Sequence, residues 1–184
     1  VLPLNSGKHD KDKKYLGNNS SRVIRYAKCS VLLLNSDNVV KEFKKVVLPL
    51  DLQKETRQKV AKACAFAKEN GSELNVVSAL LTDNPEIITK LKVQLDQVGK
   101  YIDKQGVAHS SELIYGDESK DNLADMLMRY ADDQKADLIW MMTQAETLLL
   151  KSFMGTTATR IINNSDIHVM TNVPIEMDLT RIMY

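Results

Sequence analysis

From residue 45 to residue 172, short apolar runs alternate with longer stretches in which apolar residues recur three or four positions apart. A short run that is apolar on both faces predicts a buried parallel strand, and the longer spacing predicts an amphipathic helix. Right-handed crossovers between such strands predict one parallel sheet with helices on both faces, which is an α/β fold. The strands are expected at 45–51, 74–81, 107–115, 136–142 and 167–172, and the helices at 53–70, 84–105, 119–133 and 155–164.

Glycine, proline and asparagine punctuate this pattern. Asn70-Gly71 is expected to close the first helix, and Asn84-Pro85 and Gly106 are expected to open and close the second. The segment 107–115 is less strongly apolar than the other strands, which favours a place near an edge of the sheet.

Residues 17–35 return as residues 155–173, 138 positions later, each time as a glycine, a helical pattern and a short strand. Such a glycine opens the N-terminus of a helix, where free N–H groups and the helix dipole favour an anion. The period is too long for a solenoid and fits a duplicated domain. The identical pairs are Gly17/Gly155, Arg22/Arg160, Ile24/Ile162 and Val31/Val169.

The repeat divides the chain into unequal parts. Residues 1–37 are expected to be the C-terminal remnant of a first domain, with its fourth strand, fourth helix and fifth strand, and residues 38–44 a linker. A complete domain is expected over 45–173, followed by a tail over 174–184. Because the chain begins with Val1 and not with Met, we expect further residues upstream.

The first five residues allow two interpretations. Val1–Asn5 is similar to Val47–Asp51, which would make it a first strand with residues missing between 5 and 17. The repeat offset instead places it opposite Ile139–Thr143, at the end of a fourth strand, and sets Gly7 on a glycine position. We favour the fourth-strand interpretation.

Composition and charge argue against several classes of protein. The net charge of +1 gives no basis for binding nucleic acid or an anionic membrane surface. No apolar run approaches the roughly 18 residues of a membrane-spanning helix, and no secretory signal is visible. Cys29 and Cys64 have no CxxC spacing, so we expect a reduced pair in a cytoplasmic protein rather than a disulfide or a metal site.

Three segments carry a resemblance to a known family: the strand Val46–Asp51, the strand Ala136–Met142, and the Gly155-Thr156 helix start with the strand after it. They resemble the universal stress protein family, and residues 1–37 resemble part of its tandem-domain type. The resemblance implies a doubly wound, five-stranded parallel sheet with the strand order 3-2-1-4-5. Such a sheet is Rossmann-like, of the adenine nucleotide alpha hydrolase-like kind.

In the nucleotide-binding branch of that family, the fourth strand is followed by Gly-x2-Gly-x9-Gly-[Ser/Thr]. Here Gly155-Thr156 supplies the end of the motif, but Met142 and Ala145 stand at the first two glycine positions. A methionine adds bulk where backbone must approach phosphate, and the neighbouring Glu146 would repel polyphosphate. We therefore expect that the complete domain does not bind ATP.

The N-terminal copy of this motif is better preserved. Gly7 and Gly17 keep the nine-residue gap, whereas Leu4 replaces the first glycine and Asn18 replaces the Ser/Thr. The first strand of that copy, which by the resemblance would supply adenine contacts, is absent from this chain.

The resemblance implies nucleotide contacts at several positions, and three of these residues also have simpler explanations. Asp51 lies at the end of the first strand, where the family contacts its nucleotide, but it can equally cap the helix that begins near Lys54. Thr156 and Thr157 can bond phosphate oxygens or cap their own helix. The candidate binding residues are Asp51, Gly155, Thr156, Thr157, Gly7 and Gly17.

No nucleophile or acid–base pair with an orienting partner stands out, so we expect no enzyme activity and no catalytic residues. The charged loop 7–14 lacks the spaced ligands of a closed metal site. The first hypothesis is a stress-response protein that acts by binding and assembly, without a cofactor. The alternative is an adenine-nucleotide-binding member that uses ATP as a switch. A third hypothesis is a regulatory domain of a larger transporter or kinase.

Segments 29–34 and 167–171 are expected to be last strands at a sheet edge. An apolar edge strand is a template for pairing. The resemblance implies that the last strands of two such domains pair antiparallel, giving self-association as a dimer or an intrachain pseudo-dimer. We expect strand 29–34 to cover strand 167–172 within this chain.

Overall fold

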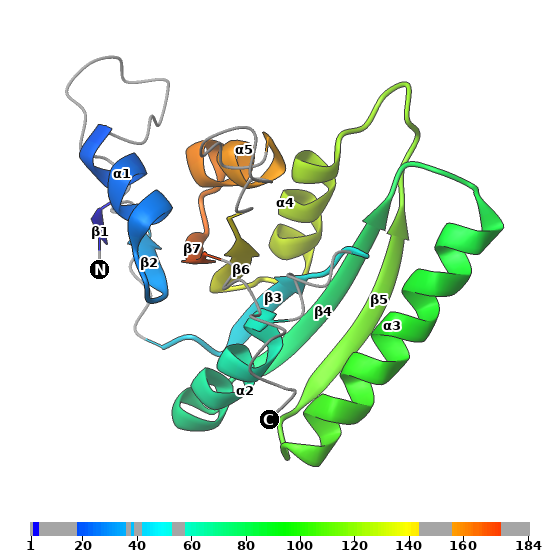
Figure 1. The fold of residues 1–184 in the computed structure, drawn as a ribbon, viewed down its shortest axis with the longest axis horizontal. Coiled ribbons are helices and arrows are strands. Elements are labelled where there is room, and N and C mark those ends of the chain that lie inside the picture. Colours follow the sequence, from blue (N-terminus) through cyan, green and yellow to red (C-terminus); the bar gives the residue numbers. More distant parts are fainter. Residues whose placement is uncertain are drawn as a thin grey trace, which may run out of the picture.

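One sheet runs through the molecule in the computed structural model, which describes residues 2–3, 18–35, 38, 42–52, 58–143 and 156–173 (Figure 1). The strands are β1 (Leu2–Pro3), β2 (Val31–Leu34), β3 (Lys45–Pro49), β4 (Glu73–Leu80), β5 (His109–Tyr115), β6 (Leu138–Met142) and β7 (His168–Asn172). The helices are α1 (Asn18–Tyr26), α2 (Gln58–Asn70), α3 (Pro85–Lys104), α4 (Leu123–Asp133) and α5 (Thr156–Asn164).

The sheet has seven strands in the order β1-β2-β7-β6-β3-β4-β5. Neighbouring strands run parallel, except that β2 and β7 are antiparallel. The expected order 3-2-1-4-5 describes the five strands from β3 to β7. The expected five-stranded, fully parallel sheet is wrong for the whole molecule, because β1 and β2 extend the same sheet beyond β7. The less apolar strand β5 ends the sheet, as expected.

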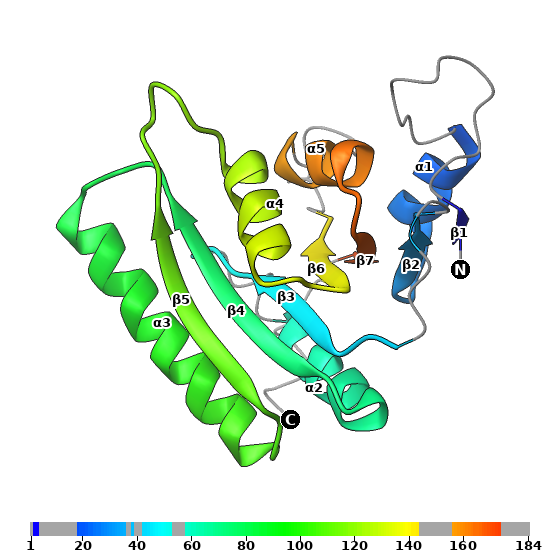
Figure 2. The same cartoon turned by 180° about the vertical axis from the view of Figure 1, so that it is seen from behind.

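Helices cover both faces of the sheet, as the two opposite views show (Figures 1 and 2). On one face, Val46 and Trp140 of the strands pack into a cluster with apolar residues of α2 and α3. On the other face, Val47 and Ile139 pack with apolar residues of α1, α4 and α5. The strands in the middle of the sheet are apolar on both sides for this reason.

Side chains and turn residues set the helix boundaries. Asn84 precedes α3, its side chain accepts a hydrogen bond of 2.9 Å from the Glu86 N–H, and Pro85 begins the helix. Gly106 follows its end with φ +68°, a conformation that favours glycine. These boundaries confirm the expected ones for this helix.

The helix expected at 119–133 begins later, at Leu123. The residues before it form a turn, in which the Asp121 N–H donates to the Asp117 carbonyl at 2.7 Å and the Ser119 N–H donates to the Asp117 carboxylate at 2.9 Å. Local side-chain bonds of this kind compete with helix formation. The expected start of the helix at 53 cannot be compared, since residues 53–57 lie outside the described residues.

The two parts of the chain meet where β2 pairs with β7. Val31 lies opposite Thr171, Leu32 opposite Met170 and Leu33 opposite Val169. The antiparallel pairing expected between these segments is therefore present within one chain. At its end, the buried imidazole of His168 accepts a hydrogen bond at Nδ1 from the Asn35 N–H, at 3.0 Å.

Acidification is expected to weaken this junction. Burial lowers the pKa of His168, and the charge of Asp137 opposes the shift. A lowered pKa favours the neutral ring in the folded protein, so stability is present above the ordinary value of 6.5 and is lost as the pH falls below it. A protonated Nδ1 also cannot accept from Asn35.

The measurement is the free energy of unfolding between pH 7.5 and pH 5, for the wild type and His168→Asn. The wild type should lose stability across this interval, and the variant should show a shallower slope. Equal slopes would show that His168 does not titrate with unfolding.

Among the described helices, none is long and apolar enough to cross a membrane.

Candidate functional site

The carboxyl ends of β3 and β6 form the point where the winding of the sheet reverses. The two strands are parallel neighbours, and the chain continues from β3 to β4 on one side and from β6 to β7 on the other. Ligands of doubly wound sheets bind outside such a point. Asp51, the first candidate residue, follows β3 directly and is exposed.

Two buried polar side chains fix the backbone that carries Asp51. Gln94 of α3 donates from Nε2 to the Asp51 carbonyl at 2.7 Å, and Ser78, within β4, donates from Oγ to the Leu50 carbonyl at 2.9 Å. The Gln94 Oε1 atom is buried without a hydrogen-bond partner. An unsatisfied buried acceptor carries a desolvation cost, so the position of this amide is held at the expense of stability.

Lys59 is the other unusual group near Asp51. It lies in the first turn of α2, and its side chain is among the largest fully buried ones. Burial lowers the pKa of Lys59 from 10.5 to about 7, and the charge of Asp51 offsets part of the effect. The ammonium and amine forms are therefore both populated near neutral pH.

The end of β6 is fastened to β7. Met142 is buried inside β6 and lies opposite Asn172, so the first glycine position of the expected motif is occupied by a strand residue. Thr143, which follows, donates both its N–H, at 2.8 Å, and its hydroxyl, at 3.0 Å, to the Asn172 carbonyl. The Asn172 side chain accepts from Trp140 Nε1 and donates to Ser30 Oγ.

Three of the six candidate binding residues are described. Asp51 is exposed after β3, and Thr156 and Thr157 form the start of α5, with Thr156 exposed and Thr157 half-buried. Because α5 follows β6, its start and Asp51 belong to the same edge of the parallel strands. Gly155, Gly7 and Gly17 lie outside the described residues, as do Ala145 and Glu146.

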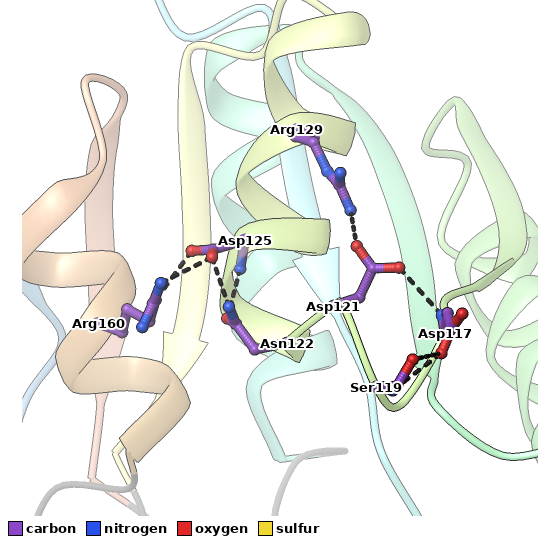
Figure 3. Close-up of polar contacts among 7 residues, drawn as sticks. All are labelled: Asp117, Ser119, Asp121, Asn122, Asp125, Arg129 and Arg160. Atoms are coloured by element: carbon purple, nitrogen blue, oxygen red, sulfur yellow. Dashed lines mark hydrogen bonds and ion pairs between the residues drawn. The ribbon is translucent and has the colours of Figure 1, made fainter.

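A network of carboxylates and arginines lies beside this edge, at the start of α4 (Figure 3). Arg160 of α5 makes two hydrogen bonds to the Asp125 carboxylate, of 2.8 and 2.7 Å. Arg129 donates to Asp121 at 2.6 Å, and Asp121 accepts from the Asp117 N–H at 3.0 Å. The hydrogen bonds from Arg160 hold the pKa of Asp125 below its ordinary value.

The same network caps α4. The Asn122 side chain caps the helix, since its Oδ1 accepts from the Asp125 N–H at 3.0 Å and its Nδ2 donates to the Asp125 carboxylate. Each carboxylate shown in Figure 3 accepts hydrogen bonds from neighbouring donors. The network therefore positions α4 against α5.

The described residues contain no group of three or more His, Cys, Asp or Glu side chains that could hold a metal ion. His109 pairs with Asp103 at 3.1 Å on the outer strand β5, away from the β3–β6 edge. Cys29 and Cys64 are free thiols, the first exposed and the second buried.

Lys59 and Gln94 were not among the expected site residues, although a signal for each exists in the sequence. Lys59 lies four positions before Ala63, and Gln94 lies between Leu91 and Leu95, so both interrupt an apolar stripe at helical spacing. A long polar residue at such a position is either buried at a cost or is held by a specific partner.

Comparison with known proteins agrees with this geometry. A model of the universal stress protein family matches residues 42–171. The chain belongs to the universal stress protein family. The match covers β3 to β7, and thus includes the whole β3–β6 edge.

Individual universal stress proteins match this one at low identity. One from Methanocaldococcus jannaschii is 24% identical over 161 residues, which are 80% of this chain and 90% of that protein. A crystal structure from Archaeoglobus fulgidus has a TM-score of 0.67 at 17% identity, covering 85% of this chain but 54% of that one. Another, from the same organism and in complex with dAMP, has a TM-score of 0.56 at 18% identity and covers 72% of this chain and 98% of that one.

Proposed function

We propose that this universal stress protein acts by binding and assembly rather than by turnover, and that its 45–173 domain does not take ATP. The structure at the end of β6 supports the proposal that this domain does not bind ATP. Its first glycine position is the buried strand residue Met142, and the donors of Thr143 are already used by Asn172. A phosphate chain needs glycine backbone and free N–H groups at this place.

Calorimetric titration with ATP tests this proposal. The wild type is expected to give no binding heat. In Met142→Gly/Ala145→Gly, binding is expected to appear, because these changes restore the glycines that let backbone approach phosphate. Adding Thr156→Ala to that variant should weaken the regained binding, since the Thr156 hydroxyl lies at the start of α5.

Thermal unfolding of each variant shows whether the fold survives the substitutions. Micromolar ATP binding by the wild type would overturn the proposal.

A second candidate function is the binding of an adenine nucleotide with one phosphate, used as a switch. The structure of one relative contains dAMP, a nucleotide with one phosphate and no phosphate chain. In the present protein, the exposed Asp51 at the carboxyl end of β3 favours this candidate. It requires that dAMP bind to the wild type and that Asp51→Asn weaken binding; absence of binding excludes it.

We further propose that residues 1–37 are the C-terminal part of a preceding domain of the same kind. Two features support this. β1 and β2 form a parallel pair joined through α1, as β6 and β7 do through α5, and the two pairs meet at the antiparallel β2–β7 junction. The chain also spans only 54% of the Archaeoglobus fulgidus chain that it matches over 85% of its own length.

The two pairs are not identical in register. Leu2 lies opposite Leu33, whereas Trp140, its counterpart in the repeat, lies opposite Met170, the counterpart of Leu32. The proposal concerns the arrangement of the elements, which a shift of one residue leaves unchanged.

A further inference from the structure

The helices α1 and α5 are the two copies of one repeated element, yet only α5 has a described helix on its outer side (Figures 1 and 2). In both views α5 lies between α1 and α4. The inner residues of the copies match, since Ile24 and Ile162 are each 1% exposed. The outer residues differ: Ile161 is 0% exposed, whereas its counterpart Val23 is 43% exposed.

A second pair shows the same difference. Ile167, which precedes β7, belongs to the core cluster that includes α4, whereas its counterpart Cys29, which precedes β2, is exposed. Val23 and Cys29 are thus exposed at positions whose counterparts in the other copy, Ile161 and Ile167, are buried. We call Arg22, Val23 and Cys29 the outer face of α1.

The contact between α5 and α4 indicates which charge a helix that packs on the outer face of α1 would carry. Arg160 binds the carboxylate of Asp125, which lies in the first turn of α4, through two hydrogen bonds. Arg22 is its counterpart in α1 and is exposed. The outer face of α1 therefore presents an exposed apolar residue, Val23, next to a cation, Arg22. The corresponding residues of α5, Ile161 and Arg160, lie on the side of α5 that packs against α4.

We propose that the outer face of α1 docks a helix of the α4 kind, amphipathic and with an aspartate in its first turn, supplied by the preceding domain of the same polypeptide. This rests on the domain assignment proposed above and does not depend on the nucleotide question. The docked helix covers Val23, and its aspartate binds Arg22.

A second copy of this chain does not fit as the occupant. The α4 helix of such a copy is already covered by its own α5. A symmetric contact between two α1 helices would bring the cationic Arg22 side chains together, and α1 has no acidic residue in its first turn to balance them.

The test uses the α4 sequence itself as the probe. A labelled peptide of residues 116–135, held helical by a cross-link between the exposed positions 129 and 133, is titrated with the full chain and followed by fluorescence anisotropy. We expect saturable binding. Val23→Asp should lower the affinity at least tenfold, because a docked helix would bury the new carboxylate without a partner.

A charge exchange tests the ion pair. Arg22→Asp should weaken binding about two- to fivefold, as befits a partly exposed pair, and a peptide with Asp125→Arg should recover the loss against that variant. Tyr26→Asn is the matched control, because Asn164, its counterpart, stays exposed although α4 is in place. This control should bind like the wild type.

Three results would overturn the proposal. The first is equal affinity for the wild type and Val23→Asp, which would place the peptide elsewhere. The second is no binding by a peptide that circular dichroism shows to be helical. The third is self-association of the chain in sedimentation that Val23→Asp abolishes, which would make a second copy the occupant. None of them bears on the ATP titration, so the two proposals fail separately.

Discussion

Replacing Lys59 with methionine is expected to raise the free energy of unfolding by on the order of 5 kcal/mol at pH 6. The fully buried ammonium has a pKa of about 7 instead of 10.5, which means that folding disfavours its charged form. Methionine keeps an unbranched side chain, one heavy atom shorter than that of lysine, and removes the charge. Its partner Asp51 is exposed, so the substitution leaves no buried carboxylate behind.

The pH dependence of the stability difference between Lys59→Met and the wild type shows whether the buried charge of Lys59 causes it. Below pH 7 both the folded and the unfolded chain carry the Lys59 proton, and the full cost is present. Between pH 7 and 10.5 only the unfolded chain binds it, so the stability of the wild type rises with pH, and the advantage of Lys59→Met shrinks.

Chemical denaturation at pH 6 and pH 9 measures both effects. Lys62→Met is the control, because Lys62 lies on the exposed side of the same helix, and its effect should be small. A loss of stability in Lys59→Met would mean that the ammonium contributes more through its contacts than its burial costs.

Truncating Ile139 to alanine is expected to cost about 2–5 kcal/mol of folding free energy. Ile139 is fully buried in β6, where it lies between Val47 of β3 and Val169 of β7. Its removal leaves a cavity under α5 that neighbouring strands cannot fill without breaking their pairing.

Urea denaturation gives the loss directly. Val93→Ala is the control, since Val93 is half exposed on α3, and its loss should stay below about 1 kcal/mol. A similarly small loss for Ile139→Ala would show that β6 is not in the centre of the sheet.

Most of the fold followed from patterns that act locally. The apolar runs around Val47 and Ile139 could only be buried strands, and Asn84-Pro85 and Gly106 are sufficient to bound α3. The helix α4 begins late because the Asp117 side chain accepts a hydrogen bond from the Ser119 N–H and so favours a turn over a helix there. The apolar pattern of the sequence does not indicate this hydrogen bond. The strands β1 and β2 join the sheet through the pairing of β2 with β7, between residues more than 130 positions apart. The repeat indicated this pairing, whereas hydrophobic periodicity alone does not specify which strands pair.

The candidate site was less predictable. Asp51 and the start of α5 could be placed at one sheet edge from strand order alone. The burial of Lys59, the orphaned oxygen of Gln94 and the pairing of Arg160 with Asp125 arise from contacts between different helices and strands. Such contacts depend on the rotation of each helix against its neighbour, which a sequence pattern specifies only coarsely.

The antiparallel junction of β2 and β7 separates two directions within the one sheet. The strands β1 and β2 point opposite to the other five, so their carboxyl ends lie at the other edge of the sheet. The N-termini of α1 and α5 consequently open toward opposite sides of the molecule. Ligands at these two helix N-termini would therefore lie at opposite edges of the sheet, joined through the β2–β7 pairs and the hydrogen bonds beside them, from Asn35 to His168 and from Asn172 to Ser30.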